Sequence, residues 1–124
     1  MFQDQVKQMY AYFDRELSHC ENRRRALAGD QREDEAVFAR VEGNVLDISR
    51  TVFKTALELS GEDRQQAERF FLNKLESITG SWRGSLNQAQ THGDAKKAHL
   101  EQVKLEAACR VKDAFTAIWR DDHE

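Results

Sequence analysis

The stretch TGSWRGS, residues 79–85, decides the fold because it decides whether the third helical segment matches the others in length. It places Trp82 between two glycines, in a chain that has no proline and six glycines. At about 100° per residue, a helix that continues through this stretch keeps Trp82 on the same stripe as Leu75 and Ile78. A random loop would not preserve that phase, so we expect the third segment to extend beyond the glycines.

Two glycines inside a helix still weaken it, by about 1 kcal/mol each relative to alanine. We therefore predict that the third helix is broken or kinked near Gly80–Gly84. The expected break lies at Thr79–Gly80, with Ser81 capping a second, nearly collinear piece. In that arrangement Trp82 fills the core of the protein and is not held out for a ligand.

Three further segments have the apolar spacing of amphipathic helices. The first is expected to end at Gly29, and DQRE, residues 30–33, is interpreted as a capping box in which Asp30 is the N-cap of the second. Gly61 separates the second segment from the third, and Gly93 separates the third from the fourth. The expected segments are residues 2–28, residues 30–59, a third from Asp63 through the glycines, and a fourth that starts with Asp94 as its cap.

Connections of two to four residues between long helices favour antiparallel neighbours. The sequence shows neither an internal repeat nor a low-complexity linker. The predicted fold is therefore all-α, an antiparallel up-down four-helix bundle that occupies residues 1–124 as a single domain.

Composition restricts the classes of function. The 124 residues are 33% charged, yet the formal net charge is only −3, which argues against nucleic acid as the main partner. No apolar run approaches the length of a membrane span, and the N-terminus does not resemble a secretory signal. The two cysteines are too few for a disulfide framework. We expect a soluble cytoplasmic protein.

Helical bundles can hold di-metal centres, and ELSH, residues 16–19, has the Glu-x-x-His spacing of such sites. The chain has only one such motif, and the helical phase places Glu16 on a flank and turns His19 towards solvent. His92, His99 and His123 are interpreted as surface histidines. The sequence therefore predicts no metal ligand and no cofactor.

Nucleophilic catalysis has no strong candidate either. Cys20 falls on the apolar seam of the first segment and is expected to be a buried thiol, whereas Cys109 points away from the main stripe of the fourth. The basic run Arg23–Arg25 is interpreted as complementing the helix dipole and pairing with the acidic residues 30–35 across the turn. No catalytic residue is assigned, and the chain is not expected to be an enzyme.

One feature exceeds what a simple bundle needs. The second segment has a main apolar seam that includes Val41, Ile48, Val52 and Leu59 and is expected to face the core. Beside this seam it carries another apolar ridge, formed by Leu46, Phe53 and Leu57. An exposed strip of this kind indicates a partner, so these residues are a candidate partner surface, most simply of a homodimer. The competing explanation is that the second helix is the central helix of an irregular bundle.

The leading hypothesis is a non-enzymatic helical bundle that acts through protein–protein contact, as a dimeric adaptor or regulator. The alternative is a bundle that binds a small ligand or metal in an internal pocket. A third hypothesis, a nucleic-acid-associated subunit, depends on Arg23, Arg24 and Arg25.

Overall fold

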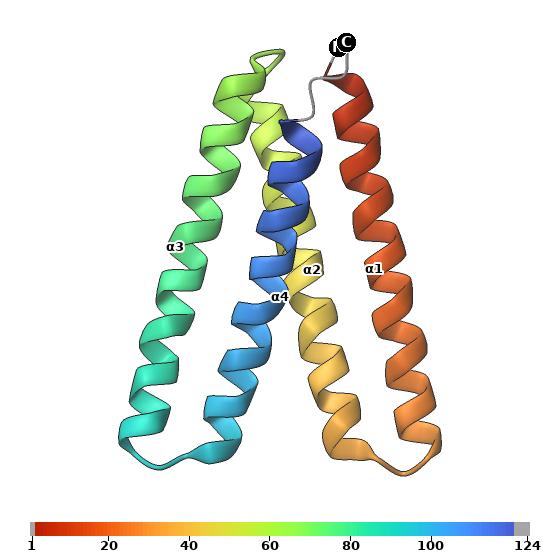
Figure 1. The fold of residues 1–124 in the computed structure, drawn as a ribbon, viewed down its shortest axis with the longest axis vertical. Coiled ribbons are helices and arrows are strands. Elements are labelled where there is room, and N and C mark those ends of the chain that lie inside the picture. Colours follow the sequence, from red (N-terminus) through yellow and green to blue (C-terminus); the bar gives the residue numbers. More distant parts are fainter. Residues whose placement is uncertain (1, 121–124) are drawn as a thin grey trace.

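The computed structural model describes residues 2–120, which form four helices and no strand. The prediction of an all-helical bundle is confirmed. Three-residue turns join consecutive helices and lie at alternate ends of the molecule (Figure 1). Within these residues, none of the helices has the length and apolar content that crossing a bilayer requires. The helices are α1 (Gln3–Gly29), α2 (Glu33–Ser60), α3 (Arg64–Thr91) and α4 (Ala95–Trp119).

Aspartate side chains cap the N-termini of the last two helices. Asp63 Oδ1 accepts hydrogen bonds from the backbone N–H groups of Gln65 and Gln66, both at 3.1 Å. Asp94 Oδ1 accepts one from the Lys97 N–H at 3.1 Å, so the predicted cap of the fourth helix is confirmed. Each bond satisfies a donor that the first turn of a helix leaves free.

The predicted capping box at residues 30–33 is wrong. Asp30 closes α1, because its N–H donates to the Ala26 carbonyl and the Arg32 N–H donates to the Leu27 carbonyl at 2.8 Å. Gln31 adopts the left-handed conformation, with φ at 61°, that such a helix end requires. The turn therefore uses Asp30 to end one helix, and α2 begins at Glu33 without a side-chain cap.

The break predicted at Thr79–Gly80 is also wrong, because α3 is helical without interruption from Arg64 to Thr91, and a kink at the glycines stays a prediction. Gly80 and Gly84 are both exposed, so neither interrupts the buried stripe. Leu75, Thr79 and Ala89 are buried on the opposite side. Packing of an amphipathic face supplies most helical stability in proteins, and here it outweighs the low helix propensity of the glycines.

An aromatic cluster forms the densest part of the core. Phe53 of α2 lies at its centre, with ring centroids of Phe13, Phe71, Phe115 and Trp119 all between 5.7 and 6.2 Å away. All five side chains are at most 1% exposed. Each buried aromatic ring stabilises the fold by roughly 1.5–3 kcal/mol, so this cluster dominates the packing energy.

The helices do not surround the core equally. Within residues 2–120, the backbones of α1 and α3 do not approach each other, whereas α2 and α4 each pack against all three other helices, including each other. Small buried residues allow this approach: Ala39, Ser49 and Ala56 on α2, and Ala107 and Ala108 on α4. Of α2 and α4, α2 makes the more extensive contacts and is the central helix.

Candidate functional site

The ridge predicted as a partner surface lies inside the chain. Leu46 is 4% exposed, Phe53 is 1% exposed, and Leu57 is half-buried against the core. The argument for a partner at this ridge assumed that it had no task within the bundle, and the aromatic cluster removes that assumption. The burial matches the competing explanation, in which the second helix is central.

Polar and small residues occupy the middle of the buried face of α2. Glu42, Ser49 and Ala56 follow one another at spacings of seven residues and so point in one direction. The Leu46 ridge forms one edge of this face. The sequence pattern indicated separate ridges because a glutamate and a serine interrupt what is one broad buried face.

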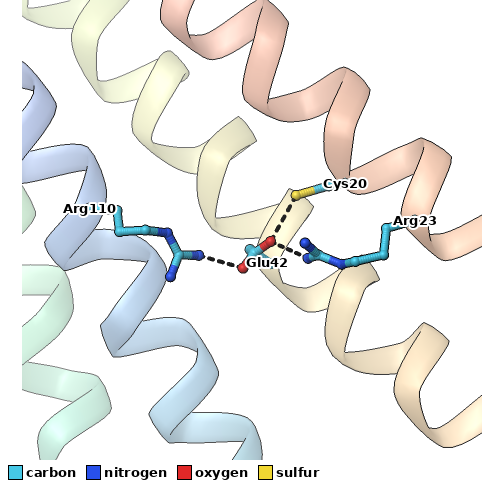
Figure 2. Close-up of polar contacts among 4 residues, drawn as sticks. All are labelled: Cys20, Arg23, Glu42 and Arg110. Atoms are coloured by element: carbon cyan, nitrogen blue, oxygen red, sulfur yellow. Dashed lines mark hydrogen bonds and ion pairs between the residues drawn. The ribbon is translucent and has the colours of Figure 1, made fainter.

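Glu42 is the polar centre of this face and connects three helices (Figure 2). Its Oε1 accepts hydrogen bonds from Cys20 Sγ of α1 at 3.1 Å and from Arg23 Nη2, also of α1. Its Oε2 accepts one from Arg110 Nη2 of α4. The side chain of Glu42 is only 16% exposed, so these charge-assisted bonds are partly shielded from water.

The surroundings in this cluster shift the pKa values of both Glu42 and Cys20. Burial alone would raise the pKa of Glu42, but hydrogen bonds from Cys20 and Arg23 and the charge of Arg110 outweigh burial and lower it. Burial, with the hydrogen bond to Glu42, raises the pKa of the Cys20 thiol to about 12. At neutral pH the cluster therefore holds a carboxylate between two guanidinium groups and a protonated thiol.

This chemistry suits structure better than catalysis. A nucleophilic cysteine needs its thiolate, and the surroundings of Cys20 disfavour it. The Glu42 carboxylate already accepts three hydrogen bonds, so it is not available as a general base. We interpret the cluster as a clasp that ties α1 and α2 to α4. The expected burial of Cys20 is confirmed, at 5% exposed, and Cys109 is exposed as its phase indicated.

The basic run finds different partners from those expected. Arg24 Nε donates to Glu21 Oε1 at 2.7 Å, and Arg25 Nε donates to Glu21 Oε2 at 3.2 Å. Arg23 pairs with Glu42, which is 19 positions away in the sequence. The predicted pairing across the turn with residues 30–35 is wrong, because acids one helical turn away and on the adjacent helix are closer.

Trp82 is half-buried, which corrects the prediction that it fills the core. Lys104 Nζ of α4 lies 5.6 Å from the centroid of the Trp82 ring, so the tryptophan makes a cation–π contact between α3 and α4. The same ammonium group donates to Glu101 Oε1 at 3.1 Å, and Glu101 is 5% exposed. Trp119 occupies the enclosed position instead: it is 1% exposed, and its Nε1–H donates to the Arg64 carbonyl at 3.2 Å.

The histidines among residues 2–120 are dispersed over the surface. Glu16 is half-buried and His19 is exposed, as their helical phase predicted. His92 follows the end of α3, and the ring of His99 lies against Phe38 with 4.3 Å between centroids. His123 lies outside the described residues. In residues 2–120, no group of three or more His, Cys, Asp or Glu side chains is placed to hold a metal ion.

Open grooves occur between helices, and the roomiest described one has a volume of about 450 Å³. It runs along α3 and α4 over a floor that includes Leu75 and Ala108. Its acidic and basic groups on α3 are paired with each other, since Arg83 Nη2 donates to Glu76 Oε1 at 2.8 Å. Ligand sites usually combine an apolar pocket with several convergent free polar groups, whereas the charged group that this groove leaves without an ion pair among residues 2–120 is Lys112 of α4.

The outward side of α2 carries two apolar residues that the sequence pattern placed in the core. Leu59 is 67% exposed and Ile48 is 40% exposed. Both lie on the stripe that the sequence pattern assigned to the core seam. We define the outer face of α2 as the exposed and half-buried residues of this side: Val41, Asn44, Ile48, Thr51, Thr55 and Leu59.

Comparisons with known protein families, with curated proteins and with solved structures found no match for this chain.

Proposed function

We propose that this chain is a non-enzymatic, single-domain protein that acts through protein–protein contact, as a dimeric adaptor or regulator built on an up-down four-helix bundle. The contact surface is the outer face of α2. Cys20 and Cys109 are both free thiols, which supports placing the protein in the reducing environment of the cytoplasm.

The observation that carries the proposal is the exposure of Ile48 and Leu59 on one side of the central helix. Leucine and isoleucine side chains at 67% and 40% exposure are the large hydrophobic residues that the described part of the chain leaves most open to water. Burying one such side chain fully is worth roughly 1.5–3 kcal/mol, so a partner that covers both gains affinity. Together with Val41 they form a stripe along the helix and not isolated surface residues.

The polar clusters support the non-enzymatic part of the proposal. The Glu42 clasp holds its carboxylate and thiol in their least reactive states. The arginines that suggested nucleic-acid contact are occupied by Glu21 and Glu42. Neither arrangement leaves a free base or a free basic patch for a substrate.

A pull-down from the native cells tests the proposal. Tagged wild type is compared with the double variant Ile48→Glu/Leu59→Glu, which keeps the core intact because both side chains are exposed. We expect at least one protein, either another protein or an untagged copy of this chain, to be retained by wild type and lost with the variant. Equal recovery of the same proteins by both baits would contradict the proposal, and Leu46→Glu serves as a misfolded comparison.

A further inference from the structure

We propose that the partner on the outer face of α2 is a second copy of this chain, with the two α2 helices packed antiparallel about a two-fold axis near Arg50. This inference rests on the proposed function, because it names the occupant of the same face.

The apolar ends of this face are symmetric about Arg50. Val41 and Leu59 each lie nine residues from it, and Ile48 lies two residues before it. In an antiparallel two-fold pair, a residue before the centre lies opposite the residue equally far after the centre of the other copy. Val41 therefore meets Leu59 of the second copy, and Ile48 lies beside its Thr51, one residue after the centre. Each contact occurs twice, so one copy covers the apolar side chains of the other.

The charged edge of the same face is complementary to itself in this orientation. Arg40, Asp47, Lys54 and Glu58 lie along one edge of the outer face, and all but Asp47 are without an ion pair among residues 2–120. Arg40 is ten residues before Arg50, and Glu58 is eight after it. Two residues of mismatch correspond to about 3 Å along a helix, which long side chains can span.

The second charge pair follows the same rule. Asp47 lies three residues before the centre and Lys54 four after it, a mismatch of about 1.5 Å. The Asp47 carboxylate accepts from Arg50 at 3.0 Å but remains 60% exposed, so it can accept a second donor. Parallel packing would instead place each of these charges beside its own copy. The pattern therefore selects the antiparallel orientation.

Short side chains at the centre of the outer face allow the two α2 helices to approach each other closely. Thr51 lies next to the axis, and Asn44 and Thr55 occupy the adjacent turns on either side of it. Their short side chains suit the 8–10 Å between axes of packed helices. The face extends from Val41 to Leu59, about 27 Å at the helical rise of 1.5 Å per residue. A single helix pair of this length is smaller than the interfaces of obligate dimers, so the dimer is expected to dissociate on dilution.

Sedimentation equilibrium of charge-reversal variants tests the pairing. Arg40→Glu and Glu58→Arg should each raise the dimer dissociation constant at least tenfold, because each places like charges together twice. The double variant Arg40→Glu/Glu58→Arg should return to within about threefold of wild type, because the pairing is restored with its signs exchanged. Lys112→Glu, an exposed change on α4, is the matched control and should leave the constant unchanged. A wild type that stays monomeric at every concentration, or a double variant weaker than both single ones, overturns the inference.

Cross-linking tests the orientation in the same chain. In a Cys109→Ser background, Thr51→Cys should form a disulfide-linked dimer, because the two copies of this position lie across the axis from each other. Asn44→Cys is equally exposed, but its two copies lie about 18 Å apart along the helices and should not be linked. Cys20 does not interfere, since it is buried and its pKa is raised to about 12. Equal linking at both positions indicates parallel packing and overturns the two-fold arrangement.

The two experiments can fail separately. If wild type is monomeric but the pull-down recovers another protein through Ile48 and Leu59, the second-copy inference is wrong and the proposed function stands. If neither experiment depends on this face, both are wrong.

Discussion

Replacing Phe53 by alanine should have one of the largest effects of any single substitution in this chain. The ring is 1% exposed and lies 5.3 Å from Tyr10 and 5.7 Å from Trp119, measured between ring centroids. Phenylalanine-to-alanine changes in cores cost about 3–5 kcal/mol, and aromatic pairs contribute about 0.5–1.5 kcal/mol beyond area alone. With several such pairs around Phe53, we expect a value near the upper limit, about 5 kcal/mol.

Urea unfolding followed by circular dichroism measures this cost. The midpoint should fall strongly for Phe53→Ala while the slope stays close to that of wild type, which identifies a change in stability. Leu59→Ala is the control: because Leu59 is 67% exposed, its truncation should change the free energy of unfolding by less than about 0.5 kcal/mol. If Phe53→Ala instead costs less than about 1 kcal/mol and removes self-association, Phe53 lies at a partner surface and the packing described above is incorrect.

Three further outcomes follow from the burial and charges of single residues. Trp119→Ala should cost about 3–5 kcal/mol and Trp82→Ala clearly less, in the same urea assay; equal costs would contradict their different burial. Glu42→Gln should destabilise the protein by about 1–3 kcal/mol at neutral pH. Because the pKa of Glu42 is lowered in the folded state, its stabilisation is present above the unfolded value of about 4.3 and is lost as pH falls through the folded value. The difference between wild type and Glu42→Gln must therefore shrink in acid, and a constant difference would refute the clasp. Native protein should expose one thiol to a thiol-reactive dye, Cys109, and a second fast-reacting thiol would mean that Cys20 is not enclosed.

The helical architecture could be predicted because local chemistry determines most of it. Gly61 and Gly93 adopt positive φ in the turns, and Asp94 caps the helix that follows. The turn at residues 30–32 is harder to predict from the sequence, because an aspartate such as Asp30 can stand at the start of a helix or at the end of one. Which role it takes depends on the conformation of Gln31, and a glutamine in the left-handed region is not a pattern that sequence predicts.

Tertiary packing decided the points that local patterns could not. Gly80 and Gly84 weaken a helix in isolation, but their effect depends on which side of α3 they occupy, and both face solvent. The helical phase placed Trp82 on the apolar stripe, yet burial also depends on how closely α4 approaches there. Trp119 is the last residue of α4, yet it is enclosed because Phe115 and Phe2 pack on its ring.

At the candidate site, too, tertiary contacts decide what the sequence pattern alone does not predict. The role of Glu42 could not be predicted from the sequence, because its partners Arg23 and Arg110 lie 19 and 68 positions away. Its position seven residues before Ser49 placed two polar residues on one line of the second helix. That line is the middle of the buried face, so the apolar residues on its two sides have the spacing of separate ridges in the sequence.

Nuclear magnetic resonance of isotope-labelled protein through a dilution series tests the central claim most directly, since it locates any contact surface residue by residue. The account predicts that backbone amide signals of the outer face of α2, including Ile48 and Thr51, shift with concentration. It also predicts that amides beside Leu46 and Phe53, on the buried side of the same helix, shift far less. Concentration-dependent shifts confined to α3 and α4, or spectra that do not change with concentration, would contradict it.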